Sequence, residues 1–274
     1  MSSPGNFSFA GGGVADAYED LLVPVLFEPW AHHLLAVQDD WKNKRVLDLA
    51  TGTGIVARLL AEQVGPAGSV VGADLNGEML SVARQRSAAS GHEIEFIESP
   101  VHPLNLSDGE FDVVVCQQGF QFFPDRTAAA GEMFRCLKGG GSVVISTWRP
   151  VTECGFFGAV CETLESLGEA EISNTMRVPF DFIAGEELAR PFEASGFSNV
   201  SVENVIKPLE IAGGVEQAVS LAYATPIAPK LRDLPQAAQI QFRDGLTECL
   251  RQLTEDGTTM GKMASNLLTA RKPV

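Results

Sequence analysis

The chain has no run of about 18 consecutive apolar residues, so its 274 residues predict no segment that spans a membrane. Residues 1–13 also lack the basic stretch followed by an apolar stretch that marks a secretion signal. We therefore expect a cytoplasmic protein without a membrane span.

Basic residues are scarce: 20 Lys and Arg stand against 35 Asp and Glu, for a formal net charge of -15. Proteins that bind nucleic acid derive much of their affinity from Lys and Arg that neutralise phosphates. We therefore expect no nucleic-acid partner, and the acidity itself is typical of a well-solvated surface.

Sequence patterns for metal sites and for a catalytic base are also missing. The five cysteines form no Cys-x-x-Cys pair and have no histidine at zinc-ligand spacing, so we expect no metal and predict buried thiols in a reducing compartment. No pattern singles out a general base among the four histidines, so the catalytic residue is left unassigned; they are His32, His33, His92 and His102.

An apolar content of 45% is enough for a full core, and the order of patterns predicts one α/β fold with insertions. Five expected strands alternate with helical patterns, which indicates a doubly wound parallel sheet. These strands are Arg45 to Leu49, Ser69 to Ala73, Ile94 to Glu98, Phe111 to Cys116 and Ser142 to Thr147.

The regions before and after these strands are mainly helical in pattern. Residues 15–37 predict two short helices because Pro24 and Pro29 interrupt them. After residue 150 we expect helices at 155–167, 185–195, 215–224 and 235–254, and strands at 199–211 and 264–270. We therefore divide the chain into N-terminal cap helices (1–39), a ligand-binding core (40–150) and an inserted cap with closing strands (151–274).

The most informative motif follows the first expected strand. Ala50-Thr51-Gly52-Thr53-Gly54 is a turn whose glycines let the backbone approach a ligand, and it opens a helix whose first amides favour an anionic group. By itself, Gly52-x-Gly54-x-x-Ala57 also fits a dinucleotide site.

Two acidic residues separate these interpretations. Asp48 stands four residues before Gly52, where it can bind an ammonium group and would repel a pyrophosphate. Asp74 ends the second strand 20 residues after Gly54, where a carboxylate can accept both hydroxyls of a ribose.

The pattern Asp48-x-Ala50-x-Gly52-x-Gly54, followed by Gly72-x-Asp74 and Met79-Leu80, resembles the class I S-adenosylmethionine-dependent methyltransferases. The resemblance is to their quinone-biosynthesis (UbiE-like, methyltransferase type 11) branch, covers residues 44–149 and extends to 264–273. It implies a Rossmann-like, mostly parallel sheet with a closing antiparallel strand, and helical N-terminal and inserted cap segments.

The resemblance also implies S-adenosylmethionine as cofactor and a role for each matching residue. Asp48 and the backbone of the turn would hold the methionine moiety, and Asp74 the ribose. Pro100 stands where the family often carries an Asp that contacts the adenine amine, so that contact is lost. The implied cofactor residues are Asp48, Ala50, Thr51, Gly52, Thr53, Gly54, Asp74, Leu75 and Met79 beside the adenine, Pro100, Val101, and Gln117 and Gln118 near the sulfonium.

The favoured function is thus methyl transfer to O, N or C of a small molecule, which the residues do not name, and they indicate no oligomeric state. Two alternatives remain: a protein that binds S-adenosylmethionine without transferring its methyl group, and a nicotinamide-dependent oxidoreductase, which Asp48 disfavours. Phe120, Phe122 and Phe123 are either core or an aromatic cage for the sulfonium. We expect the N-terminal and inserted helices to roof an apolar acceptor pocket.

Overall fold

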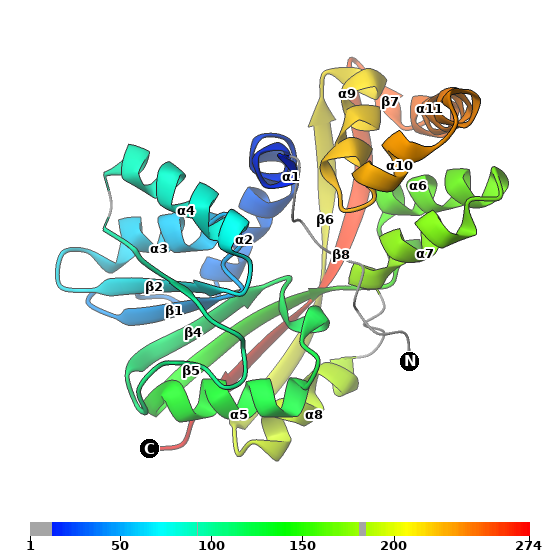
Figure 1. The fold of residues 1–274 in the computed structure, drawn as a ribbon. Helices are drawn as coiled ribbons and strands as arrows, with labels where there is room; N and C mark the ends of the chain where they lie inside the picture. The colour runs from blue at the N-terminus through cyan, green and yellow to red at the C-terminus, as the bar shows by residue number, and fades with distance from the viewer. Residues whose placement is uncertain (1–12, 92, 181–184) are drawn as a thin grey trace. The chain divides into compact units, whose positions relative to one another are not determined.

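The described part of the chain, residues 13–91, 93–180 and 185–274 of this computed structural model, is an α/β structure (Figure 1). His92 lies outside the described residues. The strands are β1 (Arg45–Leu49), β2 (Ser69–Asp74), β3 (Glu95–Glu98), β4 (Phe111–Gln117), β5 (Leu137–Trp148), β6 (Ser198–Ala212), β7 (Thr254–Glu255) and β8 (Thr258–Arg271).

These strands form one sheet in the order β3-β2-β1-β4-β5-β8-β6, with β7 paired to β8. Strands β1 to β5 pair in parallel. Strand β8 runs against β5, because Gly140 N donates to Lys272 O (3.0 Å) while Arg149 N donates to Ala264 O (3.0 Å). The expected class, a Rossmann-like, mostly parallel sheet with an antiparallel strand, is therefore confirmed.

Strands β5 and β8 are each longer by several residues than the sequence predicts. Strand β5 begins at Leu137 and passes through Gly139 to Gly141, which lie before the expected strand. This run includes an irregularity at Gly140, with φ of 78°, and stays paired because Lys272 exchanges backbone hydrogen bonds with Gly140 and Gly141. The partner strand comes from the far end of the chain, so local sequence gives no sign of the pairing.

The chain divides into two units. The first, which holds the turn from Ala50 to Gly54, comprises residues 27–147, 182–205 and 265–274. Within it, α3 (Ile55–Val64) and α4 (Gly77–Ser90) cover one face of the sheet, while α5 (Arg126–Cys136) and α8 (Gly185–Ala194) cover the other (Figure 1). Leu60 of α3 and Met133 of α5 are completely buried, one in each layer. The two layers leave the strand ends as the place where this unit can bind a ligand.

The N-terminal segment is one helical run rather than two short helices. It comprises α1 (Val14–Ala17), a π-helical stretch (Tyr18–Phe27) and α2 (Glu28–Leu35). Pro24 lies inside the π-helical stretch, whose wider turn accommodates a residue without an N–H, and Pro29 lies in the first turn of α2. The prolines therefore change the type of helix and do not end it.

The other unit comprises residues 1–26, 148–181 and 206–264. Its longer helices are α6 (Gly155–Ser166), α7 (Ala170–Arg177), α9 (Gly214–Leu221), α10 (Ala228–Asp233) and α11 (Gln236–Arg251). Short 3-10 helices occur in this unit at Val151–Glu153, Val178–Phe180 and Ala222–Ala224, and in the first unit at Phe120–Phe122. The sequence analysis missed α7 and α10, and its division at residues 39 and 150 stays a prediction.

Candidate functional site

The predicted cofactor residues of the first unit gather where its parallel strands end. Asp48 of β1 pairs in register with Gly72 of β2 and with Val115 of β4, so the turns after these strands meet at one edge of the sheet. The strand order reverses between β1 and β4, and ligands of doubly wound sheets bind outside the carboxyl ends at such a point.

Asp48 is a buried carboxylate at this edge. It is 1% exposed, and the Thr51 hydroxyl donates to its Oδ2 at 2.6 Å. Burial raises the pKa of Asp48 to about 7; the Thr51 hydrogen bond opposes this shift and the charge of Asp74 adds to it. A cation beside Asp48 would favour its ionised form, so the residue fits an ammonium group.

The turn after β1 has the backbone shape that a close ligand requires. Gly52 and Gly54 adopt φ of 56° and 84°, and Ala50 adopts the same left-handed region at 57°. An alanine costs about 1–2 kcal/mol there, so neighbouring structure must hold it. Gly119 lies close against Ala50: a methyl group added to Gly119 would lie 2.5 Å from the Ala50 Cβ.

Asp74 fastens the same turn from the neighbouring strand. Gly52 N donates to its Oδ2 at 2.8 Å and Asn76 N donates to its Oδ1 at 2.9 Å. Burial raises the pKa of Asp74, and these backbone hydrogen bonds oppose the shift. Each oxygen keeps a lone pair, so the carboxylate can also accept the two hydroxyls of a ribose.

The residues predicted to contact adenine differ in exposure. Leu75 is 69% exposed and Met79 only 5%, so Leu75 offers the larger apolar face. Pro100 is exposed and Val101 is half-buried. The residue before them, Ser99, donates its backbone N–H to Asp74 O at 3.0 Å.

Sequence reasoning missed Glu98 as a residue of this edge. It pairs in register with Asp74, which places both side chains on one face of the sheet, and its Oε2 would lie 2.9 Å from a methyl group added to Gly77. Strand β3 reads Glu-Phe-Ile-Glu and shows no alternation, so its sequence pattern gives no signal for this residue.

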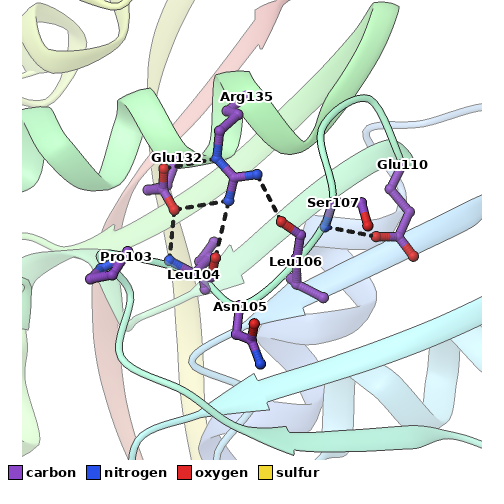
Figure 2. A pocket seen from close by; sticks show the side chains of 8 residues that line it. All are labelled: Pro103, Leu104, Asn105, Leu106, Ser107, Glu110, Glu132 and Arg135. Atoms are coloured by element: carbon purple, nitrogen blue, oxygen red, sulfur yellow. Dashed lines mark hydrogen bonds and ion pairs between the residues drawn. The ribbon is translucent and has the colours of Figure 1, made fainter.

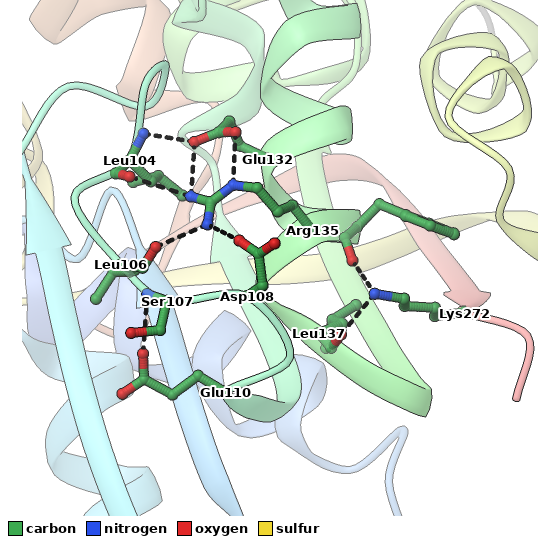
Figure 3. Close-up of polar contacts among 10 residues, drawn as sticks. Leu104, Leu106, Ser107, Asp108, Glu110, Glu132, Arg135, Leu137 and Lys272 are labelled. Carbon is green, nitrogen blue, oxygen red and sulfur yellow. Dashed lines mark hydrogen bonds and ion pairs between the residues drawn. The ribbon is translucent and has the colours of Figure 1, made fainter.

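The loop that follows Pro100 is held by Arg135 of α5 (Figures 2 and 3). The Arg135 guanidinium donates to the backbone carbonyls of Leu104 and Leu106, and to the carboxylates of Asp108 and Glu132, at 2.6–3.1 Å. Glu132 in turn accepts Leu104 N at 2.6 Å. The open pocket beside Arg135 is therefore lined by charges that already pair with one another and that hold the loop after Pro100.

Lys272 braces the end of the same helix. Its Nζ donates to the carbonyls of Phe134 and Leu137, both at 2.7 Å (Figure 3). A cation at the C-terminal end of a helix is favourable because the last carbonyls carry partial negative charge. Helix α5, which holds the loop, is thus itself fixed by Lys272, the residue that follows β8.

Four buried polar atoms at this edge have no hydrogen-bond partner among the described residues. They are Thr53 Oγ1 on the turn after β1, Gln117 Oε1 and Gln118 Oε1 at the end of β4, and Ser146 Oγ on β5. Buried polar atoms nearly always have a hydrogen-bond partner in proteins. These four atoms are therefore available to form hydrogen bonds with a bound molecule. With Asp48 and Asp74, the residues fit a ligand that carries an ammonium group, a diol and further polar groups.

Phe120 and Cys116 belong to the core. Phe120 is 0% exposed. Its ring packs against the tilted ring of Phe192 and edge-to-face against that of Phe123, with ring centroids 5.1 and 5.5 Å apart. Burial raises the pKa of the Cys116 thiol far above its usual value, so this thiol is no nucleophile. Four of the five cysteines are buried as expected; Cys249 is exposed, which corrects the expectation for that residue.

Comparison with known proteins supports the same interpretation. Residues 46–141 match the family model described as a methyltransferase domain. The chain is 44% identical over 131 residues to a demethylmenaquinone methyltransferase of Thermus thermophilus, covering 48% of this chain and 59% of that protein. It is 36% identical over 139 residues to the ubiquinone/menaquinone biosynthesis C-methyltransferase UbiE of Xylella fastidiosa, covering 50% and 55%.

The chain thus spans little more than half the length of these curated relatives. Among solved structures, a Haemonchus contortus phosphoethanolamine N-methyltransferase, in complex with phosphomonomethylethanolamine and S-adenosylhomocysteine, has the same fold. The TM-score is 0.62 at 19% identity, covering 95% of this chain and 57% of that one. Residues 46–141 thus match a methyltransferase domain, and about half of the chain is similar to quinone-biosynthesis methyltransferases.

Proposed function

We propose that this chain transfers a methyl group from S-adenosylmethionine to a small, largely apolar acceptor, and that a reduced quinone is the first acceptor to test. The observation that carries the proposal is the edge formed by Asp48, Asp74 and the turn from Ala50 to Gly54. The names of the two bacterial relatives supply the choice of a quinone. The comparisons favour this function over a nicotinamide-dependent oxidoreductase.

The residues of the edge act by binding and orientation. Asp48 would hold the α-ammonium group, the backbone of the turn the carboxylate, and Asp74 the ribose; Leu75 and Val101 would flank the adenine. The sulfonium supplies an activated methyl group, so placing the acceptor in line with it provides most of the catalysis. Methyl transfer to a reduced quinone breaks the S–CH3 bond, forms the new bond to the methyl group and releases one proton, which water can take up.

The proposal is tested by incubating the purified chain with methyl-labelled S-adenosylmethionine and a panel of acceptors that includes demethylmenaquinol and phosphoethanolamine. We expect S-adenosylhomocysteine to accumulate together with a labelled small-molecule product, most rapidly with the quinol. Tight binding of S-adenosylmethionine without turnover on any acceptor would instead support a protein that binds the cofactor without methyl transfer.

The titration of Asp48 predicts how cofactor binding depends on pH. Because its pKa is raised to about 7, the carboxyl group is mostly protonated below that value and must lose its proton to bind an ammonium group. The affinity for S-adenosylhomocysteine should therefore rise with pH, by up to about tenfold per unit between pH 5 and 7, and level off above. Calorimetric titrations across this range measure the slope.

The matched control for this titration is Asp48→Asn, which keeps the shape of the side chain and cannot titrate. Its affinity should be low and flat across the same pH range. A wild-type profile as flat as that of this variant would remove Asp48 from the ammonium site.

Pro100 predicts weak selection for adenine. Without a carboxylate at this position, the Val101 amide and apolar packing would hold the base, so an S-adenosylhomocysteine analogue lacking the exocyclic amine should bind within about fivefold of the parent. Pro100→Asp restores an acceptor and should widen the difference. If the wild-type protein rejects the analogue strongly, another acceptor is present, and Glu98 is the first residue to substitute.

A further inference from the structure

Three of the polar atoms without a hydrogen-bond partner lie near the carboxyl ends of β4 and β5. They are Gln117 Oε1, Gln118 Oε1 and Ser146 Oγ. Gln118 and Ser146 are 6% and 3% exposed. Gln117 pairs in register with Ser146, which places their side chains on one face of the sheet, and Gln118 N donates to Ser146 O at 2.9 Å. Gln117, Gln118 and Ser146 are therefore neighbouring residues at the ends of β4 and β5, within one unit of the structure.

In the side-chain amides of Gln117 and Gln118, the nitrogen forms a hydrogen bond and the oxygen has no partner. Gln117 Nε2 donates to Phe27 O at 2.9 Å, and Gln118 Nε2 donates to Ser265 Oγ at 3.1 Å. The Ser265 hydroxyl donates its proton to a carbonyl oxygen, Thr147 O at 2.9 Å or Asn266 O at 3.0 Å. In this arrangement the Ser265 oxygen accepts from Gln118 Nε2. Both glutamines are left with a carbonyl oxygen.

The position in the sheet separates Gln118 from the cofactor residues. Asp48 and Asp74 lie on β1 and β2, on one side of β4, whereas Gln118 bonds to β5 and β8, on the other side. In a doubly wound sheet both reactants meet at the reversal of strand order, here between β1 and β4. Gln118 and Ser146 thus lie on the side of β4 that faces away from Asp48 and Asp74.

We propose that Gln117 Oε1, Gln118 Oε1 and Ser146 Oγ form the polar end of the acceptor site, and that Ser265 is a positioning residue that fixes the Gln118 amide. Two carbonyl oxygens accept hydrogen bonds and donate none, so the site selects an acceptor molecule with an O–H or N–H group at or beside its methylated atom. This inference rests on the proposed function and deepens it, because it names the class of substrate.

The experiment measures binding of two matched probes to the protein saturated with S-adenosylhomocysteine, by calorimetry under anaerobic, reducing conditions. The probes are 1,4-dihydroxynaphthalene, which has two O–H donors, and 1,4-dimethoxynaphthalene, which has none. We expect the wild-type protein to bind the diol at least about tenfold more tightly than the diether. In Gln118→Met, which removes the carbonyl, the ratio should fall to about two.

Two further variants separate positioning from a general loss of structure. Ser265→Ala should lower the ratio to about threefold and accelerate hydrogen exchange of the Gln118 side-chain amide in NMR spectra, and Ser265→Thr should restore both. Gln239→Met is the matched control: Gln239 Nε2 also donates to the chain's own carbonyls, those of Arg232 and Leu234, and this variant should keep the wild-type ratio.

Affinity for S-adenosylhomocysteine is the independent measurement, and it should change less than about twofold in the control variant Gln239→Met. An unchanged ratio in Gln118→Met, equal binding of the two probes, or no binding of either to the wild-type complex would overturn the acceptor site. If S-adenosylhomocysteine still binds in that case, the proposed methyl transfer stands without it. Failure of the wild-type protein to bind S-adenosylhomocysteine would overturn the proposed function itself.

Discussion

Asp74→Ala is expected to weaken the binding of S-adenosylhomocysteine by more than a hundredfold. The variant would lose two charge-assisted hydrogen bonds to the ribose, each of about 1.5–3 kcal/mol. It would also release Gly52 N and Asn76 N, which the carboxylate holds at 2.8 and 2.9 Å, so the turn that binds the methionine moiety loses its anchor. Calorimetry on the folded variant gives the dissociation constant.

Because Asp74→Ala leaves two backbone amides without their acceptor, its stability has to be measured alongside. Asp125→Ala is the matched control: the Asp125 carboxylate accepts Ala128 N at 2.8 Å at the start of α5, and its loss should cost about 1 kcal/mol of unfolding free energy without changing affinity. A folded Asp74→Ala protein with wild-type affinity would show that the ribose does not bind at this carboxylate.

Phe120→Ala is expected to lower the unfolding free energy by about 3–5 kcal/mol, because it removes a completely buried ring from the layer between the sheet and α5. The neighbouring rings of Phe123 and Phe192 lie at 5.5 and 5.1 Å and would border the cavity. Denaturant unfolding followed by circular dichroism measures this loss.

The same variant decides between the two roles considered for the aromatic residues after β4. A core ring should leave the affinity of the folded protein for S-adenosylmethionine unchanged within about twofold, whereas a ring that contacts the sulfonium should contribute about 0.5–2 kcal/mol to binding. Phe123→Ala is the matched control; Phe123 is half-buried against the same cluster, so its loss should destabilise the protein less. A stable Phe120→Ala protein with weakened binding would show that Phe120 is a cage residue.

The structure determines how the expected role of the N-terminal helices, as a roof over the acceptor pocket, can be tested. In α2, Ala31, Leu34 and Leu35 are buried against α3 and β1 in the core of the cofactor-binding unit. Deletion of residues 1–37 would therefore remove part of that core, and loss of activity would not identify a roof over the acceptor. Substitutions that leave α2 intact are needed, and the roof stays a prediction.

The sequence determined the features that depend on neighbours along the chain. The first four strands, the helices between them, the turn from Ala50 to Gly54 and the two acids near the ends of β1 and β2 are all encoded within short segments. Short apolar runs mark the buried strands β1, β2 and β4, and glycine permits the turn. These segments also carry the resemblance to methyltransferases, so the family could be inferred from them.

Only the tertiary structure decided what depends on partners far apart in sequence. Pairing with β8 extends β5 through three glycines, Gly119 approaches Ala50, and Ser265 turns the amide of Gln118, which is 147 residues away. No local pattern encodes these contacts, because a hydrogen bond between distant segments exists only after the sheet has brought them together.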